Sequence, residues 1–185
     1  MVCGRNVDSC GTLCKRGRKR GGAEEPKDHA LGRSRGGWGT QIHLVTDGNG
    51  LPLAAVVTAG QAHESKSFED SLDAVQIPAC GPGRPRRRPS ALAADKGYSY
   101  RRIRHWLHRR KIEPVIPQRS NQVGRVGGHR GLDTAKYKRR NVVERCVGWL
   151  KECRRVATRY EKLAVNYLGM IDLAIIQRLL RAAVS

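Results

Sequence analysis

The sequence has no long hydrophobic run. No apolar stretch in its 185 residues approaches the roughly 20 residues that a helix needs to cross a bilayer. The first residues, Met1 to Arg5, lead into polar and basic sequence instead of the apolar segment of a secretory signal. These two absences argue against a membrane-spanning helix and an ordinary secretory signal, so we predict a cytoplasmic protein.

Cysteine pairs with the spacing of a zinc site are also missing. Cys3, Cys10 and Cys14 are separated by six and three residues, without a C-x-x-C pair and without a histidine nearby. Cys146 and Cys153 lie seven residues apart on the apolar side of an expected helix, where free cysteine behaves as a small hydrophobic residue. We therefore expect reduced thiols and no structural metal.

Acidic side chains are scarce. Asp and Glu number 16 against 36 Lys and Arg, which gives a formal net charge of +20 and an isoelectric point near 10.6. Such an excess of positive charge is typical of proteins that bind a polyanion. The arginines are concentrated in residues 16–20, 33–35, 84–88, 101–110 and 125–130, so the charge is spread over many loops and helix faces. Charge alone leaves DNA, RNA and acidic membranes open as partners.

The length and a hydrophobic content of 39% allow one domain with a sizeable core. Residues 1–37 are expected to form a basic, irregular leader. Two β-rich runs, Gln41 to Thr46 and Leu51 to Thr58, flank a turn signal and predict an antiparallel hairpin. Further elements are expected as a helix over 64–75, a strand over 91–94, a helix over 99–111 capped by Ser99, a strand over 114–116 and helices over 140–153 and 166–180. This order predicts a mixed α/β sheet flanked by helices.

The helix over 140–153 separates its charged and apolar residues. With about 100° per residue and Arg140 at 0°, Glu144 falls near 40° and Lys151 near 20°, and Tyr137 falls near 60° if the helix reaches back that far. The apolar residues fill the arc from roughly 200° to 340°, so a packed helix would hold Glu144 rigidly. Pairing of exposed charges four residues apart is the alternative explanation of this face.

Asp95 occupies a position of a different kind. It follows the apolar run Ala91 to Ala94 directly, where a strand ends and a helix begins, and open α/β sheets place their ligands at such points. A turn or capping aspartate is the alternative interpretation. One carboxylate at a strand end and another on a basic helix are what a two-metal phosphoryl-transfer site requires.

These residues resemble the DDE transposases of bacterial insertion sequences. One group of that family carries a tyrosine, two residues, an arginine, three residues, a glutamate, six residues and a lysine, which is the pattern here at Tyr137, Arg140, Glu144 and Lys151. The stretch from Asp95 to Tyr98 is similar to the family's aspartate region. Residues 32–37 and 40–44 are similar to the loop that leads into its second core strand, so the resemblance covers roughly residues 28–180.

The resemblance implies a fold, a reaction and a metal site. The fold would be ribonuclease H-like over residues 38–185, with a short or incomplete first strand. The family's third carboxylate lies on that strand, and Asp8 is the candidate because residues 7–9 resemble the family's V-D-S segment. Asp8, Asp95 and Glu144 would hold two Mg²⁺ or Mn²⁺ ions for cleavage and transfer of DNA strands at the ends of the element.

The resemblance also implies partners. Arg140 and Lys151 would contact DNA phosphates, Tyr137 would orient DNA or pack, and Arg33 and Arg35 are further candidates for DNA contacts. We expect a bacterial, nucleoid-associated protein that forms an oligomer on DNA. No segment fits the family's N-terminal helix-turn-helix, so an upstream-frame helix-turn-helix polypeptide is an expected partner. The alternative is an inactive, truncated remnant that acts at most as a nonspecific DNA-binding protein.

Overall fold

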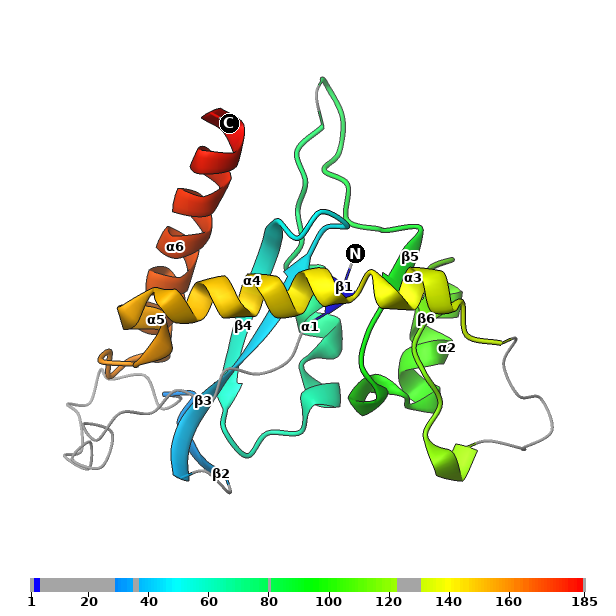
Figure 1. Cartoon of the computed structure of the whole chain (residues 1–185), viewed down its shortest axis with the longest axis horizontal. Coiled ribbons are helices and arrows are strands. Elements are labelled where there is room, and N and C mark those ends of the chain that lie inside the picture. The colour runs from blue at the N-terminus through cyan, green and yellow to red at the C-terminus, as the bar shows by residue number, and fades with distance from the viewer. Residues whose placement is uncertain (1, 4–28, 35–36, 80, 123–130, 185) are drawn as a thin grey trace.

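The structure, a computed structural model, describes residues 2–3, 29–34, 37–79, 81–122 and 131–184 (Figure 1). Within these residues, one six-stranded sheet carries helices on both of its faces. The strands are β1 (Val2–Cys3), β2 (Gly32–Ser34), β3 (Gly37–Thr46), β4 (Pro52–Ala59), β5 (Ala91–Ala93) and β6 (Glu113–Val115). The α-helices are α1 (Phe68–Asp73), α2 (Arg101–Arg109), α3 (Thr134–Lys138), α4 (Asn141–Glu152), α5 (Arg154–Ala157) and α6 (Ala164–Val184). The 3-10 helices are η2 (Glu64–Lys66), η3 (Lys96–Tyr98) and η4 (Ser120–Gln122). The predicted mixed α/β architecture is confirmed.

The strand order across the sheet is β4, β3, β1, β5, β6, with β2 paired to the outer part of β3. β3 runs antiparallel to β4 on one side and to β1 on the other, whereas β1, β5 and β6 are parallel to one another. Consequently β4, β1, β5 and β6 all point the same way. We call the edge of the sheet at which these four strands end the carboxyl edge. It includes the described residues that follow β4, β5 and β6, namely 60–66, 94–100 and 116–122.

The predicted hairpin is confirmed as β3 and β4, which pair antiparallel from Thr40↔Ala59 to Thr46↔Pro52. Asp47 closes the turn, because its Oδ1 accepts hydrogen bonds from the backbone N–H groups of Asn49 and Leu51, each at 2.8 Å. Gly50 has a φ of 91°, a left-handed conformation that glycine adopts without strain.

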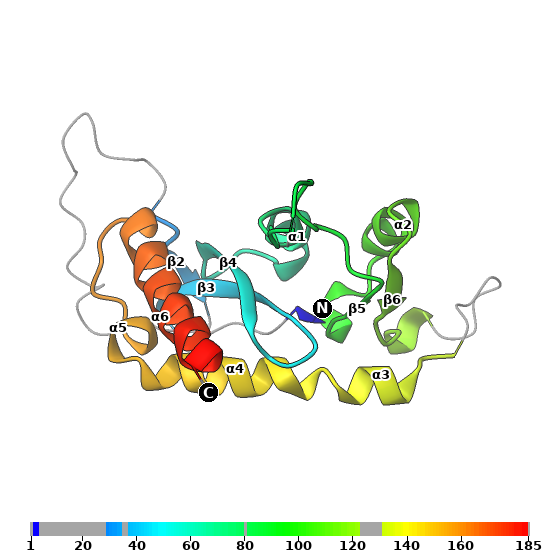
Figure 2. The same cartoon turned by 90° about the horizontal axis from the view of Figure 1, so that it is seen from above.

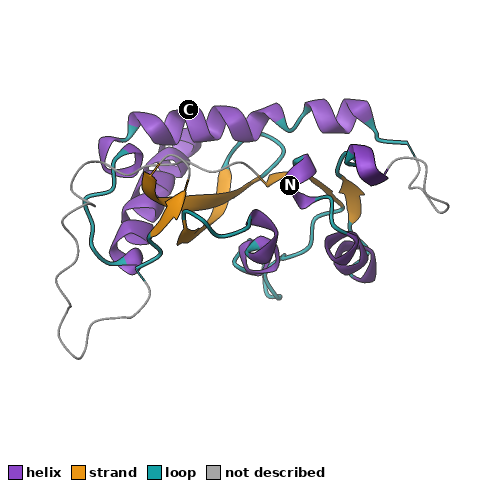
Figure 3. Cartoon of the chain, turned by 90° about the horizontal axis from the view of Figure 1, so that it is seen from below, coloured by secondary structure: helices purple, strands orange, loops and turns teal. Residues whose placement is uncertain are grey.

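Helices cover the two faces of the sheet in separate groups. α1 and α2 lie on one side, and α3 and α4 run along the other (Figures 2 and 3). Successive strand residues point to opposite faces, so Leu92 joins the α1/α2 core while Ala93 packs against α4. Val45 and Leu44 divide between the same two faces. The sheet is therefore buried on both sides.

The predicted apolar stripe is confirmed on α4, which carries Glu144 and is called the glutamate helix. Val142, Val143, Cys146 and Leu150 of α4 are buried, and its charged residues lie on other sides of the helix. Burial raises the pKa of the Cys146 thiol to about 11, so the side chain behaves as a neutral apolar group, as the sequence predicts.

Two local expectations were wrong. Gly32–Ser34 lies inside the segment expected to be irregular, yet it forms β2 by pairing with the start of β3. Ser99 does not cap α2: Tyr100 holds the cap position, and the Ser99 hydroxyl donates to Gln122 Oε1 at 2.7 Å instead. The expected final helix is present as α6; Ile171 and Ile175 pack in the core, whereas Leu173, Ile176 and Leu180 on its other sides are 50–63% exposed. Among the described residues, no helix combines the length and the apolar character that crossing a membrane requires.

Candidate functional site at the carboxyl edge of the sheet

Asp95 lies at the carboxyl edge, two residues after the end of β5. Its backbone is extended, with φ −72° and ψ 165°, and its side-chain Oδ1 accepts a hydrogen bond from the backbone N–H of Lys96 at 2.7 Å. It therefore caps η3, which is the local role that the alternative interpretation of this residue anticipates. The capping bond also orients the carboxylate relative to the end of β5.

The segment that follows Asp95 is held from the end of β6. Arg119 donates from Nε to the Lys96 carbonyl and from Nη2 to the Gly97 carbonyl, each at 3.1 Å. Gln122 donates to the Ser99 carbonyl at 2.6 Å and accepts from the Ser99 hydroxyl. These bonds connect residues after β5 to residues after β6, and they limit the movement of the chain next to Asp95.

A second set of contacts ties the same segment to the end of β4. The Tyr100 hydroxyl and His63 Nε2 are hydrogen-bonded at 2.9 Å, and the Arg119 guanidinium lies 4.4 Å from the centre of the Tyr100 ring. Glu64 fills the space beside Gly97, where a Cβ atom would come within 2.5 Å of Glu64 Oε2. The ends of β4, β5 and β6 thus meet in one polar cluster.

Glu144 lies on the first turn of α4 and pairs with a neighbour on the same helix face. Its Oε1 accepts from Arg140 Nη2 at 2.7 Å, and 51% of the Glu144 side chain is exposed against 14% of Arg140. The Arg140 guanidinium lies 5.6 Å from the ring centre of Tyr137, which is on α3 and not on the glutamate helix itself. Lys151 is exposed near the end of α4. The charged face is therefore present with the pairing that the alternative explanation expects.

The packing of α4 relates its charged face to the end of β5. Val142 and Val143 belong to one buried cluster with Ala93 of β5 and Val115 of β6. Glu144 directly follows Val143, and Asp95 is two residues after Ala93. Because side chains alternate along an extended chain, Asp95 is expected on the same face of the sheet as Ala93, the face that α4 covers.

The remaining predicted site residues divide between described and undescribed parts of the chain. Asp8 and Arg35 lie outside the described residues. Arg33 is exposed on β2, which pairs with the start of β3 and so lies toward the carboxyl edge. In the parts of the chain that the structure describes, no three His, Cys, Asp or Glu side chains group closely enough to hold a metal ion.

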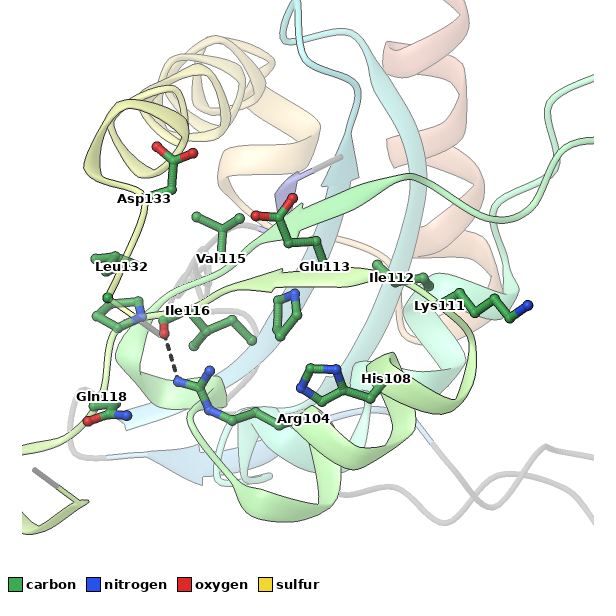
Figure 4. Close-up of a pocket in the computed structure, with 13 residues that line it drawn as sticks. Arg104, His108, Lys111, Ile112, Glu113, Val115, Ile116, Gln118, Leu132 and Asp133 are labelled. Carbon is green, nitrogen blue, oxygen red and sulfur yellow. Dashed lines mark hydrogen bonds between the residues drawn. The ribbon is translucent and has the colours of Figure 1, made fainter. Parts of the chain in front are cut away.

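A cavity of about 800 Å³ lies beside β6, between α2 and the residues before α3 (Figure 4). Arg104 and Ile116 both line this cavity, and the Arg104 guanidinium donates a hydrogen bond to the Ile116 carbonyl at 2.7 Å. Both acidic side chains of the cavity, Glu113 and Asp133, engage Lys136, at 2.7 and 3.6 Å respectively. The charged groups there serve local structure, and neither Asp95 nor Glu144 lines the cavity.

Sequence reasoning missed the residues that surround Asp95. His63, Tyr100, Arg119 and Gln122 are each ordinary in the sequence, and no motif joins them. The direction of the strands could have indicated that these residues lie close together. The strands ending near Ala94 and Ile116 were both expected, and parallel strands in that order bring the polar residues that follow them to one edge.

Comparisons with known proteins agree with the resemblance. Residues 11–177 match the family model described as the transposase DDE domain. The chain is 37% identical over 126 residues to a Burkholderia cepacia protein named "Putative transposase for insertion sequence element IS402", and the match covers 68% of this chain and 56% of that protein. The chain thus spans about half the length of this curated relative. No solved structure gives a significant match. The extent of the family match shows that this chain belongs to the transposase DDE domain family.

Proposed function

We propose that this chain is the catalytic part of a transposase that cleaves and transfers DNA strands at insertion-sequence ends with the help of Mg²⁺ or Mn²⁺. The observation that carries the proposal is that Asp95 follows β5 at the carboxyl edge, and that Ala93 of β5 packs against the helix that bears Glu144, in a member of the transposase DDE domain family. The parallel strand ends would supply one carboxylate and the packed helix another.

We infer in addition that residues 38–185 form a ribonuclease H-like catalytic domain. Support comes from the strand order β4, β3, β1, β5, β6, in which only β3 runs against the other four, and from helices on both faces. The described part of β1 pairs in parallel with β5 through Val2 and Ala93, so the chain before Asp8 reaches the centre of the sheet. This placement supports Asp8 as the third carboxylate.

The chemistry of the three carboxylates suits hard divalent cations, which prefer oxygen ligands. Asp8, Asp95 and Glu144 would hold two such ions, which supply charge stabilisation at the attacking and leaving oxygens when bound. Glu144 is half exposed and hydrogen-bonded to Arg140. Its carboxylate could therefore release Arg140 and bind a metal ion without unfolding of α4. Asp95 is already oriented by its bond to the Lys96 N–H.

The basic residues of the charged face would bind the DNA backbone. The Arg140 guanidinium is held on this face by Glu144, and it would reach a phosphate oxygen if its contact with Glu144 opens. Lys151 would act as a point charge further along α4, and Tyr137 would hold the Arg140 guanidinium in place through its ring. Arg33 and Arg35 would contact the backbone from the side of β2.

Recognition of the element ends and assembly are proposals for the whole protein. We expect DNA, a helix-turn-helix polypeptide encoded by an upstream frame and further copies of this chain as partners. The nucleotide sequence immediately upstream tests the second expectation, because an overlapping frame for such a polypeptide would support it.

Nicking of supercoiled plasmid DNA in Mg²⁺ or Mn²⁺ tests the catalytic proposal. Asp95→Asn and Glu144→Gln should each abolish metal-dependent nicking, with DNA affinity unchanged within about twofold. Glu152→Gln is the matched control, since this exposed carboxylate lies on the same helix and outside the proposed site. The control should retain wild-type activity.

Two results would contradict the proposal. If the intact chain joined to its helix-turn-helix partner shows no metal-dependent cleavage, the chain is an inactive remnant that binds DNA. If nicking persists in the Asp95→Asn variant at the wild-type rate, the activity arises elsewhere.

A further inference from the structure

A loop rich in arginine stands out from the edge of the sheet opposite the carboxyl edge. We call residues 77–79 and 81–90 the arginine arm. An isolated antiparallel β-bridge closes its base: the Ile77 N–H donates to the Arg86 carbonyl at 3.0 Å, and the Arg86 N–H donates to the Ile77 carbonyl at 2.8 Å. Figure 1 shows the arm projecting between α1 and β5, away from β2. Apart from half-buried Pro89, every described residue of the arm is exposed.

The charge of the arm is not balanced within the protein. Arg84, Arg86, Arg87 and Arg88 form no ion pair with any carboxylate of the described residues. No acidic residue occurs between positions 74 and 94. Several basic residues of the helices and their flanks differ from these, since Arg102, Arg110, Lys136, Arg140 and Arg155 each pair with a carboxylate. The four arginines of the arm are therefore available to an external anion.

The arm also has a defined shape. Its four arginines and Pro85 line an open hollow of about 610 Å³. Prolines at positions 78, 82, 85 and 89 restrict the backbone, so less conformational entropy is lost when a ligand binds. Several guanidinium groups on one stiff projection match a row of phosphates better than a single anion.

We propose that the arginine arm is a clamp for the phosphate backbone of duplex DNA outside the reacting strands. The choice of DNA among polyanions rests on the proposed function. The arm precedes β5 and Asp95 follows it, so the arm leaves the sheet at the edge opposite the one where Asp95 lies. The arm therefore contacts DNA away from the proposed chemistry, and it contributes to affinity without base recognition.

Binding of a random-sequence 30-base-pair duplex, followed by fluorescence anisotropy from 50 to 300 mM KCl, tests the clamp. The variant is Arg84→Gln/Arg86→Gln/Arg87→Gln/Arg88→Gln in the full chain. The matched control replaces four exposed basic residues elsewhere, in Lys66→Gln/Arg101→Gln/Arg109→Gln/Arg154→Gln. Both proteins carry a formal net charge four lower than the native +20.

Each phosphate contact contributes about 0.9 to the slope of log affinity against log salt concentration. The arm variant should therefore lose roughly 2 to 4 units of slope and on the order of 100-fold in affinity at 100 mM KCl. The control should lose less than about one unit. Thermal unfolding should not change, because the glutamines keep the backbone bridge and no other described contact of the arm involves these side chains. Metal-dependent cleavage of saturated DNA should keep its wild-type rate.

An unchanged slope, or an equal loss in the control, would overturn the clamp. Binding of the native chain to phosphatidylglycerol vesicles that depends on the arm, with DNA binding unaltered, would assign the arm to membranes instead. Arm-dependent DNA binding without any metal-dependent cleavage would support the clamp and refute the proposed catalysis. Metal-dependent cleavage, together with a salt dependence of DNA binding that the arm variant leaves unchanged, would support the proposed catalysis and refute the clamp.

Discussion

The buried imidazole of His43 makes the stability of this protein dependent on pH in a calculable way. His43 lies on β3 and is 1% exposed, with Nε2 hydrogen-bonded to the hydroxyls of Thr58 at 2.8 Å and Ser67 at 2.9 Å. Its Nδ1 has no partner among the described residues. Burial lowers the pKa of His43 from 6.5 to about 4, because the charged form would lose its hydration.

The sign and size follow from proton linkage. The unfolded chain takes up a proton at His43 near pH 6.5, whereas the folded chain resists it until about pH 4, so acid favours unfolding. Each pKa unit corresponds to about 1.4 kcal/mol. His43 alone should therefore remove about 2 kcal/mol of stability between pH 7 and pH 5, and about 3 kcal/mol by pH 4.

Urea unfolding at pH 7, 6, 5 and 4 measures this loss. The His43→Gln variant has no group that titrates at this position, so its free energy of unfolding should fall by about 3 kcal/mol less than that of the native chain over the same range. His105→Gln is the control, because His105 is exposed, and its curve should run parallel to the native one. Native and His43→Gln curves that stay parallel within about 0.5 kcal/mol would refute the reasoning.

Three further predictions concern packing, the surroundings of Asp95 and thiol reactivity. Gly60→Ala should destabilise the fold by about 2 kcal/mol in urea unfolding, because a Cβ atom would meet backbone carbonyl oxygens at 2.8 and 2.9 Å, whereas Gly83→Ala should be neutral. Arg119→Ala should speed amide exchange in residues 97–100 on the order of 10-fold, and equal exchange rates would show that its two carbonyl bonds do not restrain that segment. Alkylation at pH 8 followed by mass spectrometry should label half-exposed Cys153 before Cys146, whose pKa of about 11 leaves roughly a thousandth of it ionised. Labelling in the opposite order would mean that α4 opens readily.

Local patterns in the sequence were sufficient where one periodicity dominates. The hairpin of β3 and β4 follows from two β-rich runs on either side of the turn signal at residues 47–50, and the buried stripe of α4 follows from the 3.6-residue period. For the hairpin and for α4, the local sequence already indicates the element, and packing against the rest of the fold agrees with it. The position of Asp95 at the end of a buried strand was predictable from the short apolar run that precedes it, residues 91–94.

Tertiary context decided the parts that sequence reasoning missed. Ser99 has the chemistry of an N-cap, but its hydroxyl donates to Gln122 and accepts from buried Arg104, and α2 begins later. The final helix is apolar on several sides, and among the described residues only the face that includes Ile171 and Ile175 is buried. β2 is only three residues long and depends on pairing with the start of β3, so its sequence is too short to show the two-residue alternation of a strand.

The two interpretations of Asp95, as a cap and as a metal ligand, do not exclude each other. The Lys96 N–H bonds one carboxylate oxygen and fixes the side chain where β5 ends, which is the restraint that a ligand needs. Asn at this position retains an acceptor for that bond but loses the charge. If Asp95 only caps η3, Asp95→Asn should leave both stability and DNA nicking unchanged. If the carboxylate binds metal, the same variant should stay folded and lose nicking, so one substitution separates the two roles.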